Sequence, residues 1–480
     1  MTARAAAGLA EARAAALARF DDPSGYLAQL ARLVSIPTES QNPARAGDLA
    51  RYLADGVGPI FAALGYACQV FDNPDGGPIL LASREEGAPL TLLSYGHGDV
   101  ILGQDGAWSG GRDPWTLRIE GDRAYGRGVA DNKGQHLAHL TALDAVLATR
   151  GQLGFNHRFI IEMGEENGSR GFRPLVQADP APFRADAFFA SDGPRTEMGR
   201  PNITLGNRGV ANFDLVCTLR AGGHHSGNWG GLLANPAIIL ANALASICDA
   251  QGRIRVPDWQ AQPVPASVRA ALAGVSRDAG ALGPAVDPAW GAPGLSAMEK
   301  VTASNSFEVL AFAAGTPDRP VNAIPPSARA ACQLRYVPGT DPAAILPALR
   351  RHLDAAGFGE VEIAAPDRAN AIAFEATRTD PGHPWAVWIR DQVASVSGSC
   401  SVLPNSGGSN VTEVMQHDLD MPTVWLPLSY AGCNQHAPDE HILLPLMREG
   451  LEIVTAIYWA LGRAEAGGGR AARARICLRP

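Results

Sequence analysis

The segment 90-LTLLSYGHGDV-100 runs from a short apolar stretch directly into a glycine-flanked histidine and an aspartate. Residues 90–96 have the length and apolar character of a buried strand. His97 and Asp99 then follow the carboxyl end of that strand. In open α/β sheets, the loops after the strands' carboxyl ends are where sites assemble. The segment therefore predicts both a strand of an α/β sheet and one part of a polar site.

Helical and strand-like segments alternate on both sides of this strand, within residues 26–203. An amphipathic Ala/Arg-rich segment at the N-terminus predicts an ordinary opening helix. Strands that alternate with helices are typical of a sheet covered by helices on both faces, so we predict an α/β fold. The further predicted strands are 79–83, 158–164 and 186–193, and the predicted helices are 48–66 and 134–150.

A different rhythm begins near Asn202 and predicts a second domain inserted into the first. Its predicted elements, which follow an order typical of a small α+β sandwich, are strand 203–220, helix 233–247, strand 328–338, helix 342–357 and strand 360–365. Residues 256–295 are Pro/Ala/Gly-rich and too irregular to assign. The α/β rhythm resumes near Ile372, so we predict a first domain in two parts, 1–203 and 372–480, around an insert of 204–371. The Gly/Arg-rich end, from about residue 464, is expected to be loose.

The bulk composition narrows the function classes. The chain has 480 residues, of which 46% are hydrophobic and 18% are charged, and its formal net charge is -8. A net negative charge gives no case for a nucleic-acid partner or an anionic membrane, and no apolar run is long enough to span a bilayer. The seven cysteines are scattered without a C-x-x-C pair, which favours a reducing compartment. We therefore predict a cytoplasmic protein with no nucleic-acid or membrane partner.

Five short clusters combine His, Asp or Glu with nearby glycines. They are 96-GHGDV-100, 126-GRGVADNKG-134, 162-EMGEENGS-169, 190-ASDGP-194 and 432-GCNQHAPDEH-441. Taken singly, each has a plain structural explanation, such as a buried histidine, a loop cap or a solvated turn. Together they supply two imidazoles and three carboxylates, with one carboxylate able to bridge, which suits two hydrolytic metal ions. Imidazole with carboxylate favours zinc, with manganese or cobalt as substitutes. The five candidate ligands are His97, Asp131, Glu166, Asp192 and His436.

These motifs, in this order, resemble the co-catalytic zinc peptidase family that includes aminoacylase, glutamate carboxypeptidase, succinyl-diaminopimelate desuccinylase and carnosinase-type dipeptidases. The resemblance runs from about residue 26 to residue 462. It implies a catalytic domain with a mixed central sheet flanked by helices, and an inserted two-layer α+β domain that serves as lid and dimerisation domain. It also implies that the chain forms a homodimer through this lid.

The resemblance assigns roles to the residues of the clusters. His97, Glu166, Asp192 and His436 would be metal ligands, and Asp131 would be the ligand that bridges the two ions. Asp99 would orient His97, and Glu165 would be the general base that takes a proton from a metal-activated water. The next two residues after Asp131 are expected to support the site: Asn132 as a structural residue and Lys133 as a partner of the ligands.

Further candidate residues concern the substrate. The stretch 225-HSGNWGG-231 resembles a lid element whose histidine reaches the partner subunit's active site and stabilises the oxyanion, which implies this role for His225. His224, just before the motif, is expected to be a polar loop residue. Arg335 matches a family arginine that binds a substrate carboxylate. Further candidate substrate-binding residues are Asn322, Gly408 in 404-PNSGGSN-410, and Arg208. After that glycine-rich loop the chain reads 410-NVTE-413, where many dipeptidase-like relatives continue with Ile-Pro.

The sequence thus predicts a dinuclear metal-dependent hydrolase that cleaves an amide or peptide bond of a small substrate such as a dipeptide. Two alternatives stay open at this stage. One is an amidohydrolase of the same architecture that acts on an N-acyl or N-carbamoyl amino acid or another conjugate. The other is a non-catalytic binding protein that kept the fold.

Overall fold

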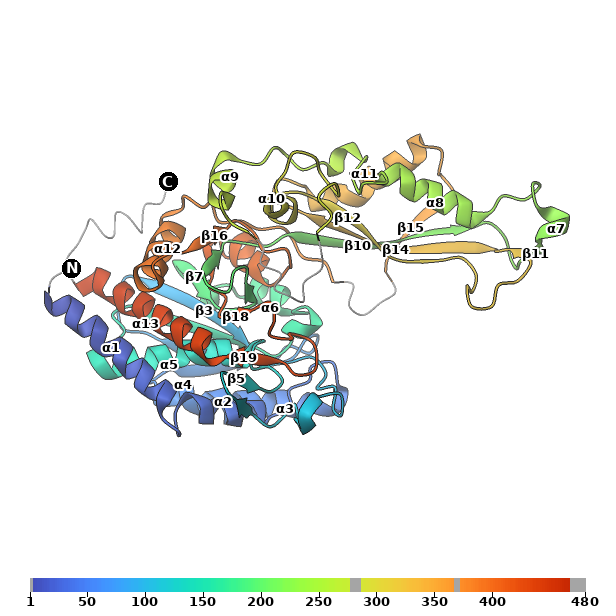
Figure 1. Ribbon diagram of the computed structural model, residues 1–480. Coiled ribbons are helices and arrows are strands. Elements are labelled where there is room, and N and C mark those ends of the chain that lie inside the picture. The colour runs from blue at the N-terminus through green and yellow to red at the C-terminus, as the bar shows by residue number, and fades with distance from the viewer. Residues whose placement is uncertain (1–2, 277–285, 367–371, 467–480) are drawn as a thin grey trace.

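The computed structural model describes residues 3–276, 286–366 and 372–466, which form a larger lobe and an elongated arm (Figure 1). The lobe is built on an eight-stranded sheet, and the arm on a four-stranded one. Residues 203–204 still belong to the larger sheet, and residue 209 begins the smaller one. The predicted end of the insert, residue 371, lies outside the described residues, so the exact domain limits stay a prediction.

The eight-stranded sheet has the strand order β1-β2-β6-β3-β7-β17-β9-β16. β3 lies between β6 and β7 and is parallel to both, whereas β1 with β2, β2 with β6 and β17 with β9 are antiparallel. The sheet is therefore mixed, as predicted. Its strands are β1 Ala67–Phe71, β2 Ile79–Arg84, β3 Thr91–His97, β6 Asn156–Glu162, β7 Ala187–Ala190, β9 Asn202–Thr204, β16 Ser401–Leu403 and β17 Thr423–Trp425.

Helices cover both faces of this sheet. On one face α1, α5 and α13 pack side by side (Figure 1), over a core that includes Phe159, Phe189 and Tyr458. On the other face α6 and η8 bury Phe172 and Met415 against the sheet. The helices of the lobe are α1 Ala3–Asp21, α2 Tyr26–Val34, α3 Ala46–Arg51, α4 Gly58–Ala63, α5 Lys133–Arg150, α6 Phe172–Ala178, α12 Pro384–Ser397 and α13 Leu444–Ala466, with a π-helix η8 Val414–Asp418.

Two glycines in β3 and just after it allow the chain to pack closely around His97. A Cβ at Gly96 would lie 2.4 Å from Cβ of His136 in α5, and one at Gly98 would lie 2.3 Å from the Tyr52 ring. Real Cβ contacts do not come this close, so both positions require glycine. The glycines around His97 thus allow α5 to pack directly on β3, and they also place the histidine at the end of the strand.

The arm carries the sheet β12-β14-β10-β15, with α8 and α11 packed on it around Phe213, Trp259 and Phe307. Its far end, distant from the lobe in Figure 1, holds the short pair β11 and β13 and the one-turn helix α7. The elements of the arm are β10 Gly209–Thr218, β11 His224–His225, α7 Ser226–Trp229, α8 Pro236–Ile247, β12 Ser306–Ala313, β13 Ala323–Ile324, β14 Ser327–Tyr336, α11 Ile345–Ala355 and β15 Val361–Ala364.

Smaller elements complete both parts. Two small ladders are formed by β4 Arg118–Glu120, β5 Arg123–Tyr125 and β19 His441–Leu443, and by β8 Pro194–Arg195 with β18 Ser429–Tyr430. The remaining helices and turns are η1 Pro43–Arg45, η2 Tyr52–Val57, η3 Ser109–Gly111, η4 Glu165–Asn167, η5 Ala181–Phe183, η6 Pro257–Trp259, α9 Ala266–Leu272, α10 Ala297–Thr302 and η7 Pro342–Ala344.

The observed elements differ from the predicted ones in several places. The single strand predicted over 203–220 is two strands, β9 and β10, in different sheets. The helix predicted over 48–66 contains a π-helical turn, η2. β12 was not predicted, and the unassigned stretch 256–295 holds η6 and α9, with residues 277–285 outside the description. α13 continues to Ala466, and the rest of the predicted loose end, 467–480, also lies outside it. Each described helix is too short or too polar to cross a bilayer.

Candidate active site

The five candidate ligands come from different elements and meet beyond one edge of the large sheet. His97 ends β3, Glu166 lies in η4 shortly after β6, and Asp192 follows β7. Because β3, β6 and β7 are parallel, the residues after them share one edge of the sheet. Asp131 lies just before α5, and His436 lies in the loop between β18 and β19. The ligand atoms of His97, Asp131 and Glu166 all lie within 4.8 Å of one another.

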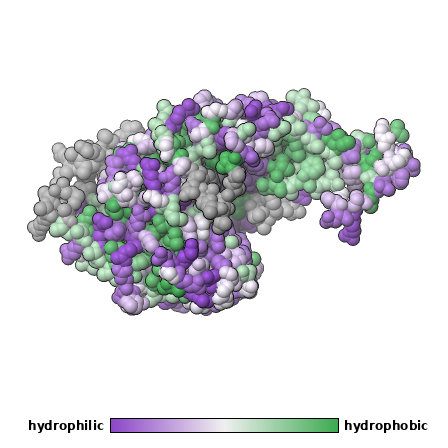
Figure 2. Space-filling view, in the orientation of Figure 1, coloured by the Kyte–Doolittle hydropathy of each residue, from purple (hydrophilic) through white to green (hydrophobic). Residues whose placement is uncertain are grey.

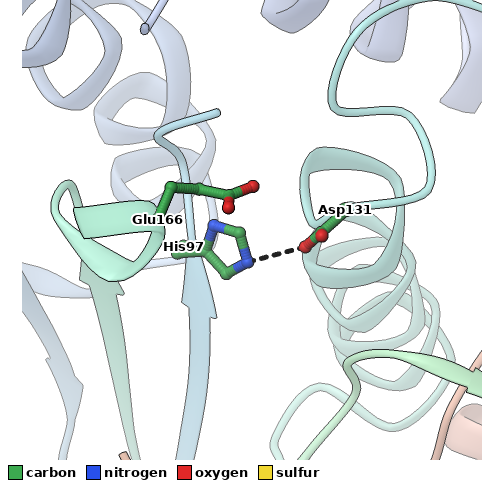
Figure 3. A group of neighbouring side chains, drawn as sticks. All are labelled: His97, Asp131 and Glu166. Carbon is green, nitrogen blue, oxygen red and sulfur yellow. Dashed lines mark hydrogen bonds and ion pairs between the residues drawn. The ribbon is translucent and has the colours of Figure 1, made fainter. Parts of the chain in front are cut away.

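The contacts divide these side chains into two groups that share Asp131. In the first ligand group, Nε2 of His97 lies 2.9 Å from Oδ1 of Asp131 and 3.9 Å from Oδ2 of Asp192. In the second ligand group, Nε2 of His436 lies 3.1 Å from Oδ2 of Asp131 and 3.1 Å from Oε2 of Glu166. Figure 3 shows the Asp131 carboxylate facing the His97 ring, with Glu166 beside that ring. The two oxygens of one carboxylate thus serve two separate imidazoles.

Asp99 ties the His97 segment to the turn that carries the two glutamates. Nδ1 of His97 lies 3.1 Å from the main-chain oxygen of Asp99 and 3.6 Å from its carboxylate. The same carboxylate accepts the main-chain N–H groups of Glu165 and Glu166, at 3.2 and 3.1 Å. An Nδ1–H group that donates to Asp99 leaves Nε2 of His97 available to a metal.

Glu440 is a supporting residue that the sequence analysis did not single out, although it lies in the quoted cluster 432–441. Its buried carboxylate accepts the main-chain N–H groups of Gly128, Ala130 and Asp131 at 3.0, 2.9 and 3.2 Å. It also pairs with the buried Arg127 guanidinium at 2.8 Å. Glu440 therefore holds the loop that presents Asp131.

The loop that carries His436 is held from several sides. The side chain of Gln104 donates to the main-chain oxygen of His436 at 3.3 Å, and Arg112 pairs with Asp439 at 3.0 Å. Gln435 donates from its side-chain amide to Oδ2 of Asp131. His436 itself has φ 62°, a left-handed conformation that non-glycine residues adopt rarely and that concentrates at functional sites.

The closely spaced carboxylates of the site shift the pKa values of one another and of the two histidines. Burial, reinforced by neighbouring carboxylates, raises the pKa of Glu165 well above its usual value, that of Glu166 to about 7 and that of Asp192 to about 6. Hydrogen bonds to Asp131 and Glu166 raise the pKa of His436 to about 11. Although burial alone would lower it, the bond to Asp131 also raises the pKa of His97. The carboxylates thus repel one another when they are ionised, and a bound divalent cation would stabilise their ionised forms.

The residues beside Asp131 act on the scaffold. Asn132 donates from Nδ2 to the main-chain oxygen of Ser191 at 2.8 Å, and its Oδ1 lies 3.2 Å from Nδ1 of His136. Lys133 is buried and donates to the main-chain oxygens of Leu33 and Ile36 at 3.0 and 2.8 Å. Its ammonium therefore anchors the end of α2, and its role is in the scaffold instead of the predicted role as a partner of the ligands.

One set of predicted substrate residues gathers where the arm meets the lobe. Nη1 of the half-buried Arg335 donates to Oγ of Ser409 at 3.0 Å, next to Gly408. Arg208 donates to the main-chain oxygen of Gly407 at 3.3 Å. Gly408 is exposed, and a Cβ there would meet nothing within 4 Å. The structure therefore brings Arg335, Arg208 and the 404–410 loop together.

The other set lies at the far end of the arm. His225 and Asn322 are both exposed, and the main-chain oxygen of Asn322 accepts the N–H of Ser226 at 2.9 Å. β11, which contains His225, lies far from the metal-ligand candidates at the end of β3 (Figure 1). His224 is half-buried, belongs to the same short strand rather than to a loop, and packs edge-on against Trp229 with ring centroids 6.0 Å apart. Within this chain, β11 with His225, and Asn322 bonded next to it, are thus separated from the metal-ligand candidates.

Known structures share this architecture of lobe and arm. An M20 family metallo-carboxypeptidase from Sulfolobus solfataricus is similar with a TM-score of 0.77 and 24% identity, over 92% of this chain and 100% of that one. Human carnosine dipeptidase 1 is similar with a TM-score of 0.71 and 22% identity, over 95% of this chain and 100% of that one. At these identities the likeness shows a common fold.

Comparison of sequences goes further. The model of peptidase family M20/M25/M40 matches residues 93–460, and the chain belongs to that family. A Beta-Ala-His dipeptidase from Mus musculus is 35% identical over 192 residues, which is 39% of each chain. A Cysteinylglycine-S-conjugate dipeptidase from Corynebacterium striatum is 34% identical over 198 residues, 39% of this chain and 43% of that protein. The chain thus spans about two fifths of the length of the curated relatives that it matches.

Proposed function

We propose that the protein is a metal-dependent hydrolase that uses two divalent cations to cleave an amide or peptide bond of a small substrate, with dipeptides as the first candidates. The observation that carries the proposal is the division of the Asp131 carboxylate between two imidazoles, with Asp192 on one side and Glu166 on the other. Membership of a peptidase family and similarity to two dipeptidases support it.

The spacing of the candidate ligands fits two small cations. Around a tetrahedral zinc with bonds of about 2.0–2.2 Å, neighbouring ligand atoms are about 3.3–3.5 Å apart. The four contacts of the two ligand groups span 2.9–3.9 Å. Two imidazoles with three carboxylates favour zinc, with manganese or cobalt as substitutes. When bound, such cations polarise the substrate carbonyl and lower the pKa of a water.

The chain's own residues would transfer the proton and bind the substrate. Glu165 would take the proton of the attacking water and pass it to the leaving nitrogen, because its buried carboxylate interacts with both ligand groups and belongs to neither. Arg335, beside the 404–410 loop, would hold a substrate carboxylate, for which a guanidinium is a good match. Asn322 and His225 would complete the site from the arm of a partner subunit.

The substrate prediction is tested by a screen of the metal-reconstituted enzyme against dipeptides, N-acyl amino acids and N-carbamoyl amino acids, read by mass spectrometry. We expect the dipeptides to be cleaved fastest, with turnover lost after chelation and restored by zinc, manganese or cobalt. Preference for an N-acyl or N-carbamoyl substrate would favour the alternative amidohydrolase. Two bound cations without any turnover would favour a binding protein.

We also propose a homodimer formed through the arm. β12 is an edge strand of the arm sheet, and its Val309, Leu310 and Phe312 are 43%, 54% and 44% exposed. Ile238 in helix α8, which packs on β10 and β14, is 62% exposed. Figure 2 shows apolar residues gathered over the arm in this view. An exposed apolar edge strand invites pairing with another copy.

Leu310→Asp is therefore expected to convert the dimer into a monomer, because it places a charge on the apolar edge. Light scattering after size exclusion measures the mass. Val70→Asp is the matched control, since Val70 is 56% exposed on β1, an edge strand of the lobe, and should leave the mass unchanged. A wild-type monomer with full activity would contradict the proposal.

The compartment is proposed from the cysteines. Cys68, Cys217, Cys248, Cys332, Cys400 and Cys433, the six within the described residues, are all free thiols. This pattern supports a reducing compartment such as the cytoplasm.

A further inference from the structure

Six buried polar side chains form a continuous hydrogen-bonded chain beneath the candidate site. In order they are Tyr66, His157, Ser94, Tyr458, His139 and Ser191. The successive donor–acceptor distances are 2.6, 3.0, 3.2, 2.6 and 2.7 Å. Tyr66 is 6% exposed, and the other five are fully buried. A buried polar group lowers the stability of the fold unless it is hydrogen-bonded. An apolar core would avoid this need, so six such groups in a row indicate a specific role.

Three members of the chain lie on the elements that deliver the first ligand group. Ser94 lies in β3, three residues before His97, and Ser191 directly precedes Asp192. His139 lies in α5, the helix that begins just after Asp131. Tyr458 of α13 joins β3 to α5, because its hydroxyl contacts both Ser94 and His139. The network therefore links all three ligand-bearing elements to one another.

His139 is the central link, and its geometry is restricted. Burial lowers the pKa of His139 to about 3, so the ring is neutral with one donor and one acceptor nitrogen. Both nitrogens are used, Nδ1 with Tyr458 and Nε2 with Ser191. The ring also packs on Phe159 and Phe189 of the sheet, with centroids 6.2 and 5.4 Å apart. A shift of α5 along the sheet would therefore break both hydrogen bonds.

Ser191 is tied to the start of α5 a second time. Its main-chain oxygen accepts from Asn132, the residue after Asp131, at 2.8 Å. Ser191, which precedes Asp192, is thus bonded both to Asn132, which follows Asp131, and to His139 of the same helix. Glu166 and His436 of the second ligand group come from η4 and from the loop before β19, and Asp99 and Gln104 hold their main chains.

We propose that this network is a positioning device for the first ligand group: it sets His97 and Asp192 relative to Asp131, and hence mainly the metal affinity of that group, because the second group shares only Asp131 with the linked elements. The inference rests on the proposed metal-dependent function. A residue that is hydrogen-bonded directly to a metal ligand changes the metal affinity by about 10–100-fold when it is removed. The network contacts the elements that carry the ligands and not the ligand side chains, so we expect the lower end of this range, about tenfold. A network that served only to stabilise the core would instead affect both ligand groups equally, through the stability of the fold.

The test uses two background variants, each of which removes a ligand from one group and leaves the other group complete. His436→Ala leaves the first ligand group intact, and Asp192→Ala leaves the second intact. Tyr458→Phe, which removes one hydroxyl and two hydrogen bonds without a cavity, is placed in each background. Tyr66→Phe is the matched control, because it also removes a buried hydroxyl from a histidine but at the far end of the network. Zinc affinity is measured by competition with a chromogenic chelator, and the unfolding temperature of each metal-free protein is recorded.

Tyr458→Phe is expected to weaken zinc binding by about tenfold in the His436→Ala background and by less than about twofold in the Asp192→Ala background. Tyr66→Phe should change neither affinity, although it lowers the unfolding temperature to a similar degree. Equal effects of the two Phe variants, or equal effects in the two backgrounds, would overturn the inference and leave the proposed function standing. A wild-type protein that binds no divalent cation would overturn the proposed function, and this inference with it.

Discussion

Replacement of Glu165 by glutamine is expected to lower kcat by about 10²–10⁴-fold while two cations remain bound. Glutamine keeps the shape of the side chain but cannot carry the proton from water to the leaving nitrogen. The metal content should stay near that of the wild type, because Glu165 is absent from both ligand groups. Steady-state kinetics with the best substrate of the screen, together with elemental analysis of the protein, measure both quantities.

Glu162→Gln is the matched control for this prediction. Glu162 is also a buried acid, whose pKa burial raises to about 7, but its carboxylate accepts a hydrogen bond from the Tyr95 hydroxyl at 2.7 Å, and no role in turnover is proposed for it. Its conversion to glutamine should change kcat only a few-fold. Retained turnover in Glu165→Gln would assign the base to another group. Loss of metal in that variant would make Glu165 a ligand instead.

Much of the candidate site could be predicted because its residues lie at recognisable places in the chain. His97, Glu166 and Asp192 each follow an apolar strand, and the carboxyl ends of parallel strands meet at one edge of a sheet. The sequence motifs therefore sufficed to bring together side chains that are far apart in the chain. The alternation of strands and helices predicted a sheet covered on both faces, and the family resemblance implied that it is mixed.

The missed features depend on contacts that leave no local pattern. Glu440 acts on main-chain N–H groups about 310 residues away, and any loop sequence offers such groups. His139 and Ser191 are single polar residues inside a helix and after a strand, where sequence alone suggests nothing beyond a core contact. Their meaning comes from Tyr458 of the last described helix, which is hydrogen-bonded to His139, and from the bond between His139 and Ser191.

The missed strands have a similar cause. The alternation of residues 203–220 continues through 205–208, where the chain passes from one sheet to the other, because periodicity does not say which sheet a strand joins. That passage is held by Asn207, Thr377 and Asn405, which bond to one another across the return of the chain. β12 follows an irregular stretch and exposes Val309, Leu310 and Phe312 in succession, so it shows no strand alternation.

His225→Ala is expected to lower kcat by about 10²–10³-fold, because it removes a donor aimed at the developing oxyanion. His225 lies at the exposed end of the arm, far from the candidate ligands of its own protomer, so we expect it to act in the site of the partner subunit. His224→Ala is the matched control. Since His224 packs against Trp229, the control should change kcat only a few-fold.

Complementation distinguishes action in the partner's site from action in its own. Co-expression of Glu165→Gln and His225→Ala chains should yield heterodimers in which one site has both a working base and the partner's histidine. With random pairing, half of the dimers are mixed and each has one working site of two, so activity should recover to about a quarter of the wild type. If His225 acted within its own protomer, every site would lack one of the two groups, and the mixture would be no more active than the separate variants. An unchanged kcat in His225→Ala alone would remove its role in either site.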